Sequence, residues 1–175
     1  MTKRLVLLGG SMRAASYSLA GLRAAATLAQ GEGAETTILS VRDLDLPIFR
    51  PNLPITDYPA AQQPGIHALV DGFRSADAMI WASPTYHGTI SGAVKNALDY
   101  AELLRGDARP YLQGVPIGLI AVSDPTTFGA MISSDHDLRA WLAPTRVALR
   151  KEHFDAELRW SMSGRRRACC GRSAS

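Results

Sequence analysis

Short apolar runs alternate with longer amphipathic segments along most of the chain. Most of the apolar runs are continuous, which is typical of strands buried on both faces of a parallel sheet. The segments between them are rich in Ala, Leu and charged residues and repeat their apolar positions with a helical period. The pattern predicts strands at residues 4–10, 34–41, 77–83, 116–123 and 145–150, and helices at residues 16–33, 65–76, 89–104 and 133–143, the last with Ser133 or Ser134 as its N-cap.

This alternation of strand and helix predicts an α/β fold, in which a parallel sheet carries helices on both faces. Five strands connected in this way fit a flavodoxin-like, doubly wound sheet with strand order 2-1-3-4-5. The Pro-rich segment 42–65 interrupts the pattern and predicts a long loop. We therefore expect one flavodoxin-like domain over residues 1–160.

The pattern ends after the fifth predicted strand. A sheet of this kind is closed by a further helix, and residues 154–160 ("FDAELRW") predict the beginning of one. The next residues, "SMSGRRRACCGRSAS", have no apolar periodicity. We expect residues 161–175 to form a disordered tail, or an aberrant one in which a natural last helix has been lost.

The composition excludes several classes of protein. With 46% hydrophobic and 20% charged residues, the chain has the balance of an ordinary globular protein. No apolar run approaches the roughly 20 residues that span a bilayer, and the N-terminal run lacks the length and cleavage site of a signal peptide, so we expect a cytoplasmic protein without membrane association. The two cysteines, Cys169 and Cys170, are adjacent, which excludes a disulfide scaffold, and no His or Cys cluster predicts a metal site. The net charge of +3 comes largely from the tail, so nucleic-acid binding is not predicted.

Three polar loops follow strands whose carboxyl ends lie beside the reversal of strand order, where open α/β sheets bind ligands. The first, residues 9–18 ("GGSMRAASYS"), opens a helix whose N-terminal amides favour a phosphate. Ser11, Ser16 and Ser18 add hydroxyl groups, and Arg13 adds a charged fork. The loop is neither G-x-G-x-x-G nor a Walker sequence, so we expect side chains to hold one terminal phosphate. The alternative is a capped helix with solvated side chains.

The second and third loops offer a site for a planar ring. After the third strand, Pro84 fixes the backbone, Tyr86 supplies an aromatic plane and Gly88 allows close approach of a ligand. Thr85 and His87 can reach the polar edge of a ring, and the loop 123–131 after the fourth strand presents Ser123 at the same sheet edge. Ordinary surface packing is the alternative for these residues. A phosphate site beside a flat-ring site indicates a mononucleotide with a planar base, which we interpret as flavin mononucleotide (FMN).

The sequence resembles the NAD(P)H-dependent FMN reductases of the flavodoxin-like superfamily, a group that includes chromate, quinone and azo-dye reductases. "GSMRAAS" is similar to the family's G-S-x-R-x-x-S phosphate loop, and "DLPIF" to its D-L-P motif. "SPTYHGTISGAVKNALDY" is similar to its long signature S/T-P-x-Y-x-x-x-x-x-G-x-x-K-N-x-x-D-W/Y. The motifs occur in order, and the resemblance covers roughly residues 3–150. The chain departs from the family after the fourth strand, where "SDPTTFGA" replaces a Gly-rich segment.

The resemblance implies a role for each candidate residue. The side chains of the first loop would hold the FMN phosphate, while Ser123 would contact the flavin from the third loop. Lys95, Asn96 and Asp99 would have structural and interfacial roles. The resemblance also implies a homodimer or homotetramer in which a neighbouring subunit covers the flavin. The residues that would line the ribityl chain and the isoalloxazine are Pro84, Thr85, Tyr86 and His87.

We expect an enzyme in which NADPH, or NADH, passes hydride to the flavin, and a small-molecule acceptor then takes the electrons. The acceptor would be free flavin, a quinone, an azo compound or a metal oxyanion. No catalytic side chain is predicted, because the cofactor carries the chemistry. Two alternatives stay open: a flavodoxin-like electron carrier, and a flavin-free, inactive relative.

Overall fold

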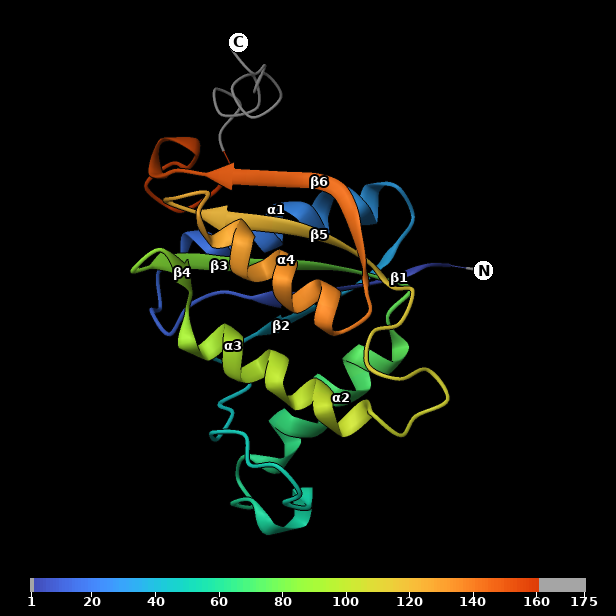
Figure 1. Cartoon of the computed structure of the whole chain (residues 1–175). Coiled ribbons are helices and arrows are strands. Elements are labelled where there is room, and N and C mark those ends of the chain that lie inside the picture. Colours follow the sequence, from blue (N-terminus) through green and yellow to red (C-terminus); the bar gives the residue numbers. More distant parts are fainter. Residues whose placement is uncertain (1, 161–175) are drawn as a thin grey trace.

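The computed structural model describes residues 2–160, which form a central sheet with helices on both faces (Figure 1). Each neighbouring pair of long strands is parallel, and a two-residue strand, β4 (Thr89–Ile90), pairs antiparallel with the end of β3. Because β4 lies off the main path, the order of the five long strands is the predicted 2-1-3-4-5, and the doubly wound fold class is confirmed. The long strands lie in the order β2 (Glu35–Ser40), β1 (Arg4–Gly9), β3 (Ala78–Tyr86), β5 (Pro116–Val122) and β6 (Trp141–Leu149).

The helices divide between the two faces of the sheet (Figure 1). One face carries α1 (Tyr17–Gly31) and a smaller cluster of buried side chains around Leu7 and Leu22. The other face carries a larger cluster that includes Phe73, Trp81 and Tyr100. This second layer consists of α2 (Gln63–Ser75), α3 (Gly92–Asp99), α4 (Thr127–Asp137) and the short 3-10 helix η2 (Tyr100–Leu104).

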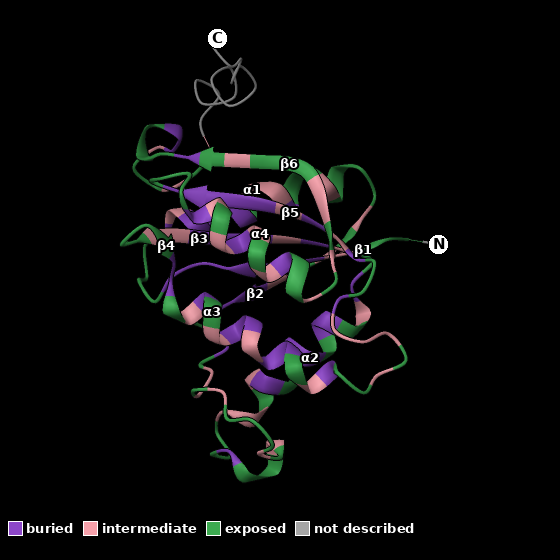
Figure 2. Cartoon of the chain, viewed as in Figure 1, coloured by how far each residue is buried: buried purple, intermediate pink, exposed green. Residues whose placement is uncertain are grey.

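Burial on both faces explains why the central strands β1, β3 and β5 contain continuous apolar runs, whereas the edge strand β6 is largely exposed (Figure 2). In β1, Val6 and Leu8 belong to the larger cluster, while Leu7 between them belongs to the smaller one. Successive side chains of a strand point to opposite faces, so every residue of such a run is buried.

Two predicted elements at the carboxyl edge were wrong. The third strand does not end at residue 83 but runs to Tyr86 and turns back into β4, so the expected loop is a hairpin. The predicted helix 89–104 is consequently divided into β4, α3 and η2. The side chain of Ser91 accepts the N–H of Val94 and so caps α3, which begins three residues later than expected.

The C-terminal third also differs from the prediction. Helix α4 begins at Thr127 rather than near Ser133, and the Ser134 hydroxyl donates to the carbonyl of Ala130 inside the helix instead of capping it. No helix begins at residue 154, because Phe154 and Trp160 form an isolated antiparallel bridge. The predicted tail, residues 161–175, lies outside the described residues, and the domain boundary at residue 160 stays a prediction.

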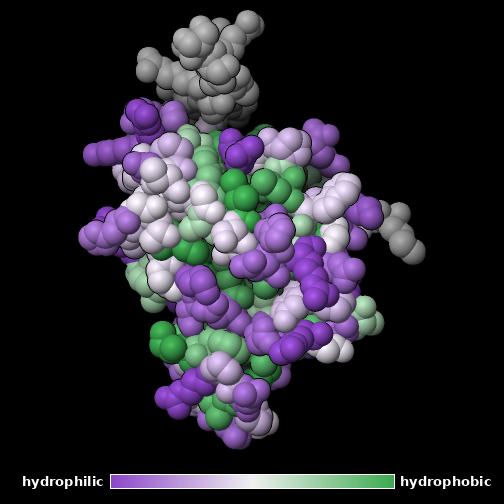
Figure 3. Space-filling model, viewed as in Figure 1, coloured by the Kyte–Doolittle hydropathy of each residue, from purple (hydrophilic) through white to green (hydrophobic). Residues whose placement is uncertain are grey.

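Hydrophobic and hydrophilic residues are interspersed on the face of the molecule shown in Figure 3. Within residues 2–160, no helix is long and apolar enough to cross a membrane.

Candidate functional site

The three predicted loops meet at one edge of the sheet, because β1, β3 and β5 are adjacent and parallel. Gly9, at the end of β1, is in register with Ala82, and Pro84 is in register with Val122 at the end of β5. The loop after β1, the β3–β4 hairpin and the loop after β5 are therefore neighbours (Figure 1).

Two glycines bring the first loop tightly against β3. Gly9 has φ +143°, and a side-chain Cβ at this position would lie 1.9 Å from the carbonyl oxygen of Ala82. The amide of Gly10, whose φ is +100°, donates to that same carbonyl at 3.2 Å. No larger residue fits at Gly9, so close to the Ala82 carbonyl. The glycine pair therefore fixes where the loop leaves the sheet.

The serines of the first loop shape the beginning of α1. Ser16 is the N-cap, and its Oγ accepts the N–H of Leu19 at 3.2 Å. The Oγ atoms of Ser16 and Ser18 lie 3.0 Å apart in a hydrogen bond, and both residues are buried. Ser11, which is also buried, accepts the N–H of Arg13 at 3.3 Å. These hydroxyls thus hold the loop in shape, and Ser18, like Ser16, is buried rather than at the surface.

The donors left over in this loop fit a phosphate. Arg13 is exposed and forms no ion pair with any residue of the described chain. Loop 9–18 contains no carboxylate, and the first turn of α1 has no acidic residue. The amides of Tyr17 and Ser18 have no acceptor among residues 2–160, as is usual for the first turn of a helix. Free amides at a helix N-terminus together with an unpaired arginine form a donor set suited to an anion.

The second predicted loop is a hairpin with a two-residue turn. His87 and Gly88 both have positive φ, +52° and +80°, as a type I′ turn requires. Tyr86 pairs with Thr89 beside this turn, and 40% of its surface is exposed. The turn therefore presents an aromatic side chain at the carboxyl edge of the sheet.

The hairpin is also held by Ser83, a residue that the sequence interpretation missed. Ser83 is fully buried, and its Oγ accepts the amide N–H of Ser91 at 3.0 Å. Pro84 follows it in β3 and is partly buried. Ser83 thereby fixes the point at which the chain leaves β4 and enters α3.

The third loop is shorter than predicted and consists of residues 123–126. Ser123 has φ +84°, and its amide donates to the carbonyl of Leu149 at 2.9 Å. A carboxylate oxygen of Asp124 accepts the amide of Thr126 at 2.8 Å, and this bond lowers the pKa of Asp124. The Thr85 hydroxyl donates to the carbonyl of Asp124 at 2.7 Å, so the second and third loops are joined.

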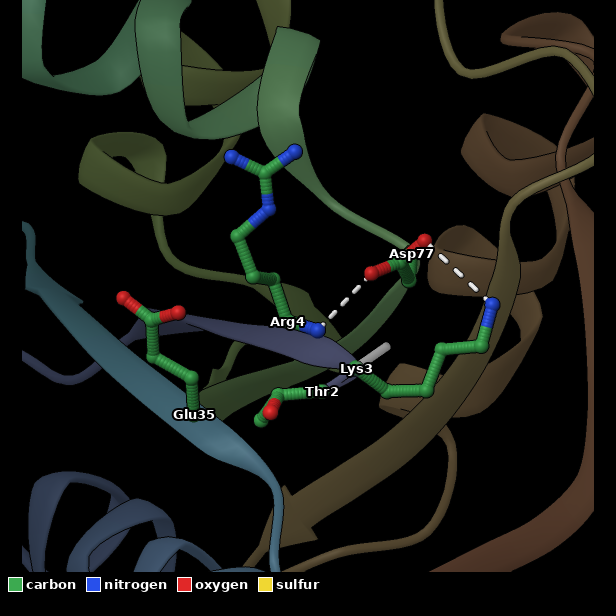
Figure 4. Close-up of a pocket in the computed structure, with 5 residues that line it drawn as sticks. All are labelled: Thr2, Lys3, Arg4, Glu35 and Asp77. Atoms are coloured by element: carbon green, nitrogen blue, oxygen red, sulfur yellow. Dashed lines mark hydrogen bonds and ion pairs between the residues drawn. The ribbon is translucent and has the colours of Figure 1, made fainter.

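A hollow of about 400 Å³ lies at the opposite edge of the sheet, beside the amino ends of β1, β2 and β3 (Figure 4). Asp77 accepts the amide of Arg4 at 2.8 Å, which lowers the pKa of its carboxyl group, and Lys3 lies 3.6 Å from its other oxygen. Because parallel α/β sheets bind ligands at the carboxyl ends of their strands, this hollow is not the candidate site.

The sequence matches the NADPH-dependent FMN reductase family over residues 3–153. It is 31% identical over 159 residues to the NADPH-dependent FMN reductase ArsH of Shigella flexneri, covering 87% of this chain and 59% of that protein. It is 33% identical over 98 residues to the probable NADPH:quinone oxidoreductase 2 of Oryza sativa, covering 55% of this chain and 46% of that protein. The chain thus spans less than two thirds of the length of these curated relatives.

Solved structures share the fold. The flavoenzyme NAD(P)H:(acceptor) oxidoreductase FerB from Paracoccus denitrificans superimposes with a TM-score of 0.73 at 21% identity, over 94% of this chain and 90% of that chain. A flavodoxin from the domain Archaea superimposes with a TM-score of 0.56 at 9% identity, over 89% of this chain and 88% of that chain. At these identities the likeness establishes the architecture alone, which is the flavodoxin-like one predicted.

Proposed function

The chain belongs to the NADPH-dependent FMN reductase family, and on this premise we propose that it is an oxidoreductase that moves hydride equivalents from NADPH, or NADH, to a small-molecule acceptor with the help of bound FMN. The observation that carries the proposal is that the N-terminus of α1, the β3–β4 hairpin and the loop 123–126 meet at the carboxyl edge of β1, β3 and β5. Bound FMN would supply the ring that accepts and releases the hydride.

Residues of this chain would bind and orient the cofactor. Arg13 and the first amides of α1 would hold the phosphate, and Ser11, Ser16 and Ser18 would keep these donors in place. Tyr86, at the hairpin turn, would lie against the ring or the substrate that stacks on it. The positive φ of Gly88 and of Ser123 turns the backbone at the two places where a ring would approach it.

We propose in addition that the protein is a cytoplasmic homodimer or homotetramer. Three large apolar side chains are exposed at or beyond the carboxyl ends of strands: Met12 (59%) after β1, Ile48 (76%) after β2 and Tyr86 (40%) at the end of β3. Apolar side chains in such positions favour cover from another chain or from a bound molecule. The acceptor, a free flavin, a quinone, an azo compound or a metal oxyanion, would enter from the same open edge.

The test is an anaerobic visible spectrum of the purified protein with added FMN, before and after NADPH. We expect a bound-flavin spectrum that bleaches on addition of NADPH. Bound flavin that does not bleach with NADPH or NADH would instead indicate an electron carrier. A protein that retains no FMN would contradict both and indicate a flavin-free relative.

A further inference from the structure

Hydrogen bonds of two threonine hydroxyls connect the β3–β4 hairpin to the start of α4. The Thr85 hydroxyl donates to the Asp124 carbonyl at 2.7 Å and also contacts the Thr127 hydroxyl. Thr127 is the first residue of α4 and is fully buried, and its Oγ1 also lies 3.5 Å from the carbonyl oxygen of Thr89 in β4. Thr127 therefore reaches both strands of the hairpin from the helix.

The donor and the acceptor of each of these hydrogen bonds can be assigned. A threonine hydroxyl has one proton to donate and can accept as well. Because Thr85 gives its proton to the carbonyl of Asp124, the contact between the two threonines requires Thr127 to be the donor. The 3.5 Å approach to Thr89 is long for a hydrogen bond and leaves that proton for Thr85. The Thr127 hydroxyl thus donates to the Thr85 hydroxyl, which donates in turn to the carbonyl of Asp124 in the third loop.

The position of Thr85 also sets the direction of its neighbours. Trp81 lies in the cluster under α3 and α4, and Ala82 lies in the cluster under α1. Side chains alternate along a strand, so Thr85 points to the face of α4, while Tyr86 points to the face of α1 and the first loop. Holding Thr85 on one face therefore directs Tyr86 to the other.

From these contacts we propose that Thr127 is a positioning residue, which acts through Thr85 to lock the hairpin and the loop 123–126 into one rigid platform for a planar ring. The inference rests on the proposed function for the identity of the ring. The rigid connection between the hairpin and the loop, which we call the lock, does not require a bound ligand. Its β-branched side chain, which has few accessible rotamers, suits Thr127 to this role.

The lock is tested first without any ligand, by hydrogen–deuterium exchange of the amides of residues 86–91 and 123–126 in the full chain. Thr127→Val preserves the shape of the side chain and removes its hydroxyl. We expect exchange in both segments to become about tenfold faster, as the loss of one hydrogen bond of ordinary strength implies. Thr127→Ser, which keeps the hydroxyl, should restore slow exchange. Unchanged exchange in Thr127→Val would overturn the lock, whatever the protein binds.

The second test compares the binding of FMN and of riboflavin by fluorescence titration. Thr127→Val should weaken both ligands by a similar factor, about five- to tenfold, because the platform holds the ring that they share. The control is Thr36→Val on the edge strand β2. It removes a hydroxyl that is hydrogen-bonded to Gln30 of α1 and should leave both affinities unchanged. Faster exchange with unaltered affinities would overturn the role of Thr127 in ring binding.

If the unmodified protein binds neither flavin, the proposed function fails together with the flavin role of Thr127. The exchange experiment still decides whether Thr127 fixes the hairpin. The two failures are therefore distinguishable.

Discussion

At the scale of single residues, Arg13 carries the charge that would separate FMN from an uncharged flavin. Its side chain is exposed, and no carboxylate lies in its loop. We expect Arg13→Ala to weaken FMN by about 10- to 100-fold, the range of a charge-assisted hydrogen bond, and to leave riboflavin unchanged. Fluorescence titration with both ligands measures this. Arg23→Ala, at an exposed arginine in the second turn of α1, is the control. An equal loss for both ligands would remove Arg13 from the phosphate site.

Asp135 is a residue whose chemistry affects stability. It is buried in α4, its Oδ1 has no hydrogen-bond partner within residues 2–160, and burial raises its pKa from 3.8 to about 6. Because the folded-state pKa lies above the unfolded one, the unfolded state ionises first as the pH rises. The free energy of unfolding should therefore fall between about pH 4 and pH 6 and then stay level.

We accordingly expect Asp135→Asn to be more stable than the unmodified protein at pH 8, by up to roughly 3 kcal/mol. The difference should shrink steadily as the pH falls from 6 to 4. Urea denaturation at several pH values measures it, with Asp137→Asn, a change at an exposed carboxylate of the same helix, as the control. Parallel pH profiles for the Asp135 variant and the unmodified protein would show that this carboxyl group is not the cause.

At the scale of elements, the close approach of β1 to β3 depends on Gly9. A Cβ at this position would lie 1.9 Å from the Ala82 carbonyl, and its φ of +143° is strained for any other residue. We expect Gly9→Ala to lower the free energy of unfolding by at least about 2 kcal/mol. Gly31→Ala, at the end of α1 with no atom within 4 Å of its Cβ, should be neutral or slightly stabilising. Urea denaturation compares the two, and similar values would contradict the close approach.

The same elements show why the sequence predicts some of the structure and misses other parts. Continuous apolar runs such as 116–123 identify buried strands, because burial on both faces leaves an unambiguous pattern. The rule that ligands bind at the carboxyl ends of parallel strands then predicts from sequence alone that the loops 9–18 and 123–131 meet, although the second of these proves shorter in the structure. The strand β4 has only two residues, which is too short to show a period, so the sequence predicts an open loop at His87 where the structure has a hairpin.

The start of α4 was misplaced for a related reason. Ser133 and Ser134 match the usual preference for an N-cap, but the amide of Thr126 is satisfied by the carboxylate of Asp124, two residues earlier in the chain. Thr127 was missed altogether, since its partner Thr85 is 42 residues away and no local pattern marks such a pair. Contacts between distant segments decide these details, while local sequence decides the class of each element.

The whole molecule is covered unequally on its two faces. Three α-helices pack on one face of the described sheet and α1 alone on the other, where a sheet of this order was expected to have a closing helix. The segment that follows β6 closes part of that face. Phe154 lies between two rings, with centroid distances of 5.5 Å to Tyr17 and 5.6 Å to Trp160. An aromatic cluster thus takes part of the place of the expected helix.

This cluster couples the stability of the molecule to its candidate site, because Tyr17 follows the N-cap Ser16 directly. We expect Phe154→Ala to lower the free energy of unfolding by roughly 3 kcal/mol, and also to weaken FMN by loosening the start of α1. Trp141→Ala, at an aromatic residue that is 74% exposed on the edge strand β6, should change stability by less than about 0.5 kcal/mol. Thermal unfolding and FMN titration measure both effects. A Phe154→Ala protein as stable as the Trp141 variant would mean that residues 150–160 do not close this face of the sheet.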